Sequence, residues 1–173
     1  MMNSEKKVYK GLKWLFSFFV GIMGVATVGF IVLFTILNLP AVSQELAALV
    51  DGLPADMASI LVMSSPLFVL SMIANFVLYG VVFYLGRKFF KNLEIDQIFV
   101  ETNVVTAKKI ALILLILSVS TCLPELFANM NGVVMGDSAF LDLTYIVGAA
   151  IVWALAKILE KANIIAEENE LTI

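Results

Sequence analysis

Four apolar stretches divide this chain into five polar segments, and every Lys and Arg residue lies in only three of them. The 11 basic residues occupy positions 6–13, 87–109 and 157–161. The other two polar segments contain no basic residue, and their acidic residues are Glu45, Asp51, Asp56, Glu125, Asp137 and Asp142. Basic residues that flank membrane spans are retained on the cytoplasmic side. The alternation therefore predicts four spans, with both termini in the cytoplasm and two acidic loops outside.

This pattern predicts an all-α fold, an integral membrane four-helix bundle that forms a single domain over residues 1–173. The expected spans are at about 14–39, 60–86, 108–124 and 142–159, and the last helix is expected to continue to about residue 169. The composition, 61% hydrophobic and 14% charged, excludes an ordinary soluble domain. The first uncharged run is much longer than the apolar core of a signal peptide, so we expect an uncleaved span. The expected location is the cytoplasmic membrane, with the bilayer as the first partner.

Several local signals refine this outline. Pro66 either kinks the second span or begins it, because proline is tolerated in the first turn of a helix. Asp56 and Thr102 are candidate N-caps for the second and third spans. Apolar residues at helical spacing predict a short interfacial helix over 42–50. The apolar loop 124–142 is expected to lie on the bundle or in the headgroup region.

The residue inventory argues against several classes of function. The chain has no histidine and one cysteine, Cys122, which we interpret as a small packing residue. It has no nucleophile elbow, phosphate loop or zinc motif, so we expect neither an enzyme nor a metal or cofactor site. Its basic residues flank spans rather than form one basic face, so direct nucleic-acid binding is not expected. Asn75 is the strongest polar residue at membrane depth, and either packs between helices or coordinates a transported ligand.

Two cytoplasmic segments have a more specific composition. The loop before the third span contains Phe99 and Asn103, and the chain ends in Glu168, Asn169, Glu170, Leu171, Thr172 and Ile173. In both segments the chain resembles a family of small bacterial four-span membrane proteins of unknown function. Members of that family have a Pro-Phe-x-x-Glu-Asn loop and a Glu-Glu-Asn-(Asp/Glu)-Leu-Thr-(Val/Ile) tail. Ile98 and Thr102 depart from the loop motif. The resemblance implies no activity, but the family is often encoded beside a small helix-turn-helix regulator.

These segments predict a cytoplasmic contact between the tail and the loop. We expect the Asn103 side chain to bond nearby backbone, with Leu171 and Ile173 beside Phe99. The candidate latch or docking residues are Phe99, Asn103, Glu168, Asn169, Leu171, Thr172 and Ile173. The leading function is a membrane-embedded regulatory or sensory protein that contacts a cytoplasmic regulator, with a second copy as another candidate partner. An immunity or stress-protection protein against membrane-active peptides is the alternative, and a small transporter or channel is the third hypothesis.

Overall fold

The structure is a computed structural model that describes residues 2–50, 64–133 and 141–170. Every regular element in these ranges is a helix: α1 (Met2–Leu37), α2 (Pro40–Val50), α4 (Pro66–Glu94), α5 (Glu101–Ser120), α6 (Leu123–Met130) and α7 (Leu143–Glu170). Four helical segments are long and apolar enough to cross a bilayer: Ser4–Leu37, Pro66–Glu94, Glu101–Met130 and Leu143–Glu168. The predicted all-α fold with four membrane-spanning helices is therefore confirmed.

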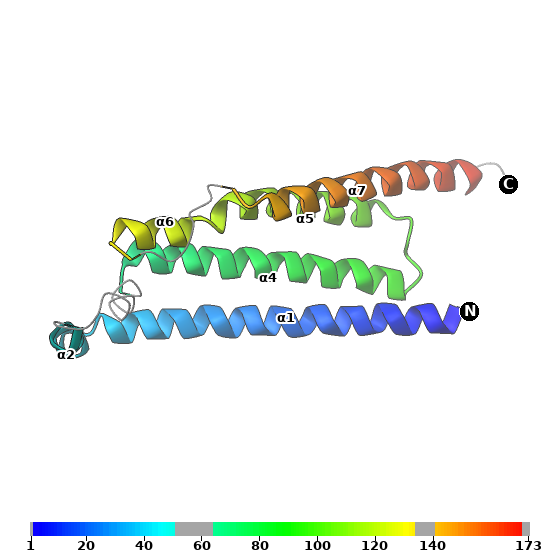
Figure 1. Cartoon of the computed structure of the whole chain (residues 1–173). Helices are drawn as coiled ribbons and strands as arrows, with labels where there is room; N and C mark the ends of the chain where they lie inside the picture. The colour runs from blue at the N-terminus through cyan, green and yellow to red at the C-terminus, as the bar shows by residue number, and fades with distance from the viewer. Residues whose placement is uncertain (1, 51–63, 134–140, 171–173) are drawn as a thin grey trace.

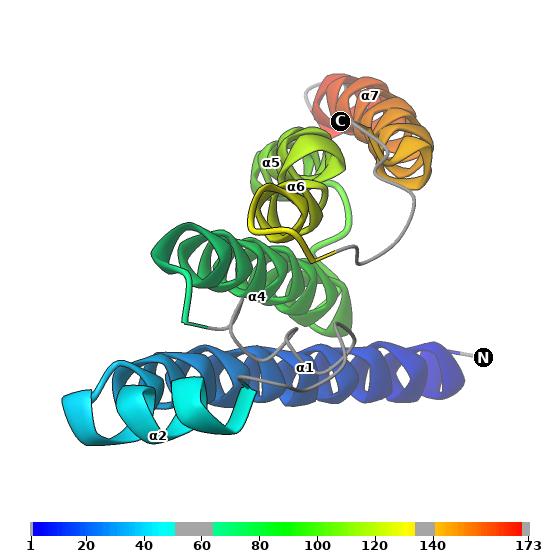
Figure 2. The same cartoon turned by 60° about the vertical axis from the view of Figure 1, so that its left-hand side comes forward.

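The four long helices pack as successive neighbours. The main contacts join α1 to α4, α4 to α5, and α5 to α7, while α6 packs on α4. Figures 1 and 2 show α1 and α7 at the two edges of this row. No residue of α1 whose exposure is described is fully buried. Its apolar side chains, such as Val25 and Val28, are exposed, as suits a helix surrounded by hydrocarbon.

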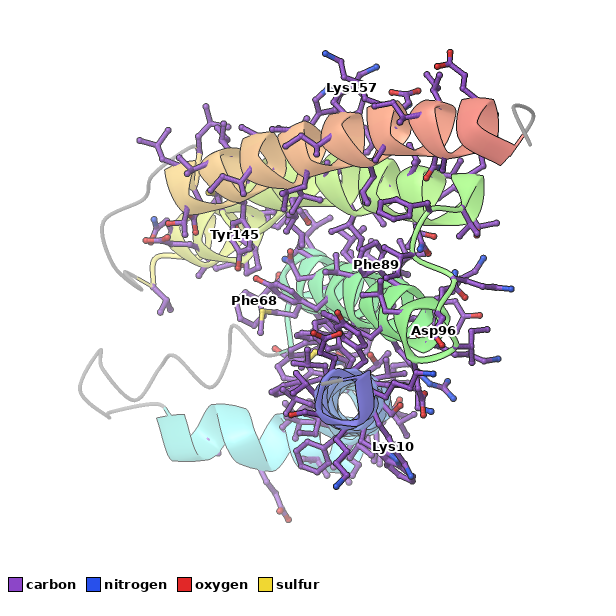
Figure 3. The ribbon with its side chains drawn as sticks, turned by 90° about the vertical axis from the view of Figure 1, so that its right-hand side faces the viewer. Lys10, Phe68, Phe89, Asp96, Tyr145 and Lys157 are labelled. Carbon is purple, nitrogen blue, oxygen red and sulfur yellow. The ribbon has the colours of Figure 1, made fainter. Side chains whose placement is uncertain are left out.

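The two ends of the row differ in charge. The start of α1, the end of α4, the start of α5 and the end of α7 share one end of the molecule (Figure 1). All 11 basic residues lie in the halves of these helices nearest that end, which we call the basic end. Figure 3 views the molecule from this side and labels Lys10, Asp96 and Lys157. The opposite, acidic end carries α2 and α6.

The helix boundaries follow local chemistry that the sequence partly predicts. Pro66 begins α4 rather than kinking it, with Ser65 in an extended conformation before it. The short helix expected over 42–50 is present as α2. The Asp142 carboxylate accepts a hydrogen bond from the Thr144 N–H at 2.9 Å, and α7 then continues to Glu170, as predicted. The candidate N-cap Asp56 lies outside the described residues.

Two boundary predictions are wrong. Thr102 is not an N-cap, because α5 begins at Glu101 after the extended residue Val100. The third helix also does not run unbroken to residue 124: α5 ends at Ser120, and α6 begins at Leu123. Proline at position 124 has no N–H for the Ser120 carbonyl, and its ring crowds that carbonyl. The helix therefore breaks one turn before the proline.

The seam between α1 and α4 is aromatic at the basic end. Phe16 contacts Phe83 and Phe90, with ring centroids 5.9 and 5.3 Å apart, and Phe19 stacks on Phe83 at 5.0 Å. Gly86 lies directly under the Phe16 ring, where a methyl group would overlap that ring. The absence of a side chain at residue 86 therefore lets the first helix approach the second.

Candidate functional site: the inner loop at the basic end

The loop at the basic end begins with a well-formed helix stop. Asp96 has φ of 62°, in the left-handed region, immediately after α4. The Gln97 N–H donates to the Asn92 carbonyl at 2.9 Å, and the Asp96 N–H donates to the Leu93 carbonyl at 3.2 Å. These two bonds are those of a Schellman motif, with Asp96 at the position that glycine usually occupies. The chain therefore leaves α4 in a defined direction. We call residues 95–100 the inner loop.

Asn103 holds the inner loop from the first turn of α5. Its Nδ2 donates to the carbonyl oxygens of Gln97 at 2.7 Å and Ile98 at 2.9 Å, and its Oδ1 accepts from Asn92 Nδ2 at 2.8 Å. The residue is 0% exposed. A fully buried amide with both ends bonded fixes its neighbours strongly, because each lost bond leaves a buried polar group without a partner. The expected bonding of Asn103 to nearby backbone is thus confirmed.

Apolar side chains remain open on the same loop. Phe99 and Ile95 are each 54% exposed. They lie just beyond the end of α4, where the loop turns back towards α5. The backbone is therefore held from inside by Asn103, while its outer surface presents two large apolar groups. An exposed apolar group on a rigid backbone is the arrangement that interface cores use.

The other candidate residues are placed less completely. Glu168 is exposed near the end of α7, and Asn169 belongs to the same helix. Leu171, Thr172 and Ile173 lie outside the described residues, so the contact between the tail and Phe99 stays a prediction. The structure places Phe99 in the inner loop that Asn103 holds from the first turn of α5.

The last turns of α7 project from the basic end. At 28 residues, α7 is about 42 Å long, which exceeds the ~30 Å hydrocarbon core. The Glu160 carboxylate accepts hydrogen bonds from Lys108 of α5 at 2.8 Å and from Lys157 at 2.9 Å. Ile164 and Ile165 beyond this network are 52% and 58% exposed. The predicted extension of the last helix therefore forms, but part of its apolar surface stays uncovered within the described chain.

Asn75, the polar residue predicted at membrane depth, has a clear structural contact. Its Nδ2 donates to the Ser120 carbonyl at 2.9 Å and to the Ser71 carbonyl at 3.0 Å, and the residue is 5% exposed. Ser120 is the residue whose carbonyl loses its helical partner at Pro124. Asn75 on α4 thus donates to this carbonyl of α5, in place of the backbone N–H that Pro124 lacks. This contact favours the packing interpretation over ligand coordination.

Sequence reasoning missed two further contacts. Asn92 was not singled out, although it is the only side chain that the described part of the chain offers to Asn103 Oδ1. The feature that could have indicated it is a single amide side chain in the last turn of α4. The hydroxyls of Tyr79 and Tyr145 also share a hydrogen bond that links α4 to α7. No sequence spacing indicates that pair, because it depends on how the helices are arranged.

The described residues contain no group of three His, Cys, Asp or Glu side chains placed to hold a metal ion. Cys122 is partly buried at the break between α5 and α6, and its thiol lies 3.8 Å from the Ser118 carbonyl.

Residues 2–173 match a family described as "Protein of unknown function (DUF2975)". The chain belongs to this family. The match covers the four helices, the inner loop and the tail, so the whole chain follows the family pattern. Comparisons with curated proteins and with solved structures give no match.

Proposed function

We propose that this DUF2975 protein is a membrane-embedded regulatory or sensory protein that acts through protein–protein contact at its cytoplasmic face. The observation that supports the proposal is the inner loop, whose backbone is held by buried Asn103 while Phe99 stays half exposed. A preorganised apolar group costs less ordering entropy on binding than a mobile one. The partner we propose is a small soluble regulator of the helix-turn-helix type.

The proposed orientation rests on charge. All 11 basic residues lie towards the basic end, and positive residues near spans favour the cytoplasmic side. The inner loop and the end of α7 would then face the cytoplasm of a cell, where a soluble regulator has access to them. The acidic end, with α2 and α6, would face outwards.

The proposal is tested by a photo-crosslinking amino acid placed at Phe99 in cells that also contain a tagged candidate regulator of the helix-turn-helix type. We expect a crosslinked product with the regulator from position 99. The matched control is the same amino acid at Leu126 of α6, which is exposed at the acidic end. A product from Leu126 and none from Phe99 would contradict the proposal.

A second variant distinguishes loss of the contact with the regulator from loss of folding. Phe99→Ser removes the apolar group from an exposed position, so the protein should accumulate in the membrane at the wild-type level. Co-purification of the regulator should fall about tenfold, the loss expected when one interface anchor of about 1.4 kcal/mol is removed. Unchanged co-purification with Phe99→Ser would exclude the inner loop as the contact site.

A further inference from the structure

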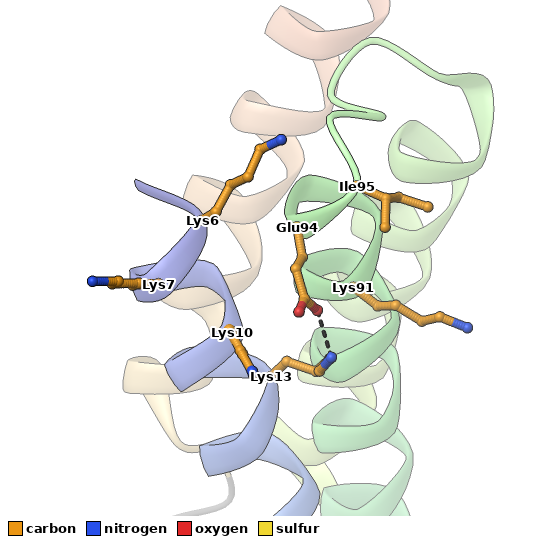
Figure 4. A pocket seen from close by; sticks show the side chains of 7 residues that line it. All are labelled: Lys6, Lys7, Lys10, Lys13, Lys91, Glu94 and Ile95. Carbon is orange, nitrogen blue, oxygen red and sulfur yellow. Dashed lines mark hydrogen bonds and ion pairs between the residues drawn. The ribbon is translucent and has the colours of Figure 1, made fainter. Parts of the chain in front are cut away.

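A second feature of the basic end is a cleft between α1 and α4. It has a volume of about 540 Å³ and is lined by Lys6, Lys7, Lys10 and Lys13 of α1 and by Lys91, Glu94 and Ile95 at the end of α4. We call it the lysine cleft. Figure 4 shows that its two walls come from the first and second spans. Lys13 lies next to Trp14, where the uncharged run of α1 begins, so the cleft is at headgroup depth.

The lysine cleft has an excess of positive charge. Lys13 forms an ion pair with Glu94 across the cleft, and Lys6 forms one with Asp96. Lys7, Lys10 and Lys91 form no ion pair within the part of the chain that the structure describes. In Figure 4 the Lys7 and Lys91 side chains extend outwards from the two walls, away from the ion pair between Lys13 and Glu94, so they add positive charge on either side of the cleft. The cleft is therefore suited to an anionic group.

An apolar pocket lies one helical turn deeper. It has a volume of about 280 Å³, and its lining includes Phe16 of α1, Gly86 and Phe90 of α4, Ile110 of α5 and Leu159 of α7. Phe16 follows Lys13 by three residues, and Phe90 precedes Glu94 by four, so these pairs lie on the same faces of their helices. The ion pair between Lys13 and Glu94 thus lies above the contact between Phe16 and Phe90. The apolar pocket therefore begins at the α1–α4 seam below the ion pair, and its other walls come from α5 and α7.

We propose that the lysine cleft and the apolar pocket together bind one anionic phospholipid of the surrounding bilayer. Lys10 holds the phosphate, the positive charge of Lys7 and Lys91 on either side attracts the anionic headgroup, and an acyl chain enters the pocket beside Phe16. A soluble phosphate compound could bind the lysine cleft through the same charges, but it has no acyl chain to enter the apolar pocket. The inference is independent of the proposed function, because it concerns the bilayer and not a soluble partner.

The test is native mass spectrometry of the full chain in detergent, with phosphatidylglycerol or phosphatidylcholine added at equal concentration. We expect one phosphatidylglycerol to be retained at least about tenfold more strongly than phosphatidylcholine, as electrostatic attraction to a few lysines supplies. The variant Lys7→Gln/Lys10→Gln should lose about tenfold in phosphatidylglycerol retention. The control Lys88→Gln/Lys161→Gln removes the same charge from the basic end outside the cleft, and should stay within about twofold of wild type.

Two more arms complete the design. Lys7→Arg/Lys10→Arg keeps the charge and should keep lipid retention, which separates loss of charge from damage to the fold. Glycerol phosphate at the lipid's concentration should not displace phosphatidylglycerol, since it lacks an acyl chain. Equal retention of the two lipids, an equal loss in the Lys88/Lys161 control, or full displacement by glycerol phosphate would each overturn the proposal.

Discussion

Two buried asparagines, each bonded at a place where one helix ends or another begins, show how similar residues serve different purposes. At the basic end, Asn103 donates to two carbonyls of the inner loop and accepts from Asn92. In the half nearer the acidic end, Asn75 donates to the carbonyls of Ser71 and Ser120. Each amide donates to at least one backbone carbonyl that has no partner within a helix. Their acceptor oxygens differ, because Asn75 Oδ1 is buried and makes no hydrogen bond within the described chain.

Asn103 therefore determines a loop conformation, whereas Asn75 compensates for an interrupted helix. All of the Asn103 bonds are made within residues 92–103, so they determine the shape of one loop and the exposure of Phe99. The Asn75 bond to Ser120 joins two spans and compensates for Pro124. A loop whose shape is determined by several hydrogen bonds is suited to a contact surface. A helix break whose free carbonyl is bonded by Asn75 is suited to internal packing.

The largest effect is expected for Asn103→Leu. The change removes three hydrogen bonds and leaves the Gln97 and Ile98 carbonyls and the Asn92 amide without this partner. We expect the free energy of unfolding to fall by about 3 kcal/mol, at 1–3 kcal/mol for each buried group left unpaired and with partial relaxation. Thermal unfolding in detergent measures the loss. A loss below that of Asn75→Leu would contradict the difference drawn between the two asparagines.

The aromatic part of the seam between α1 and α4 offers an intermediate case. At Gly86 a methyl group would overlap the Phe16 ring, so Gly86→Ala should separate α1 from α4 and cost about 2 kcal/mol, as overpacking of a tight contact does. Gly80→Ala is the matched control, because its methyl group would meet Met23 Cβ at an ordinary 3.6 Å. The same unfolding measurement should show little change for the control. Equal losses at both glycines would show that the close approach at Phe16 is unimportant.

The smallest effect is expected for Asn75→Leu, at about 1 kcal/mol, within the range measured for polar bonds between membrane helices. A double-mutant cycle with Pro124→Ala sharpens this prediction. Alanine restores an N–H that can bond the Ser120 carbonyl, so Asn75→Leu should cost roughly half as much in that background. Strict additivity of the two changes would show that Asn75 does not compensate for the proline.

Much of this architecture could be predicted because membrane spans depend on few variables. Uncharged runs indicate the four helices, and the positions of Lys and Arg indicate which ends share a side. The bonding of Asn103 could be predicted because its partners are its neighbours in sequence. The early helix end at Ser120 is also local, since it follows from Pro124, although the span expected at about 108–124 ends at the proline instead of one turn before it.

The remaining features depend on how the helices are arranged. Nothing in the sequence pairs Gly86 with Phe16, or Tyr79 with Tyr145, because these contacts join spans that no pattern aligns. The order of the helices in the row, with α1 and α7 at opposite edges, also cannot be predicted, because the apolar runs are hydrophobic on every face. Thr102 was chosen as an N-cap from its residue type, whereas the loop is closed by Asn103 from within the helix.

The central claim is that the inner loop faces the cytoplasm and leaves Phe99 open to a partner. It is tested most directly by a single cysteine at Phe99 in a Cys122→Ser background, with a membrane-impermeant maleimide applied to intact cells. We expect no labelling until the cells are permeabilised, followed by rapid labelling, whereas a single cysteine at Leu126 reacts in intact cells. Labelling of the Phe99 position in intact cells, with Leu126 protected, would reverse the orientation and contradict the account.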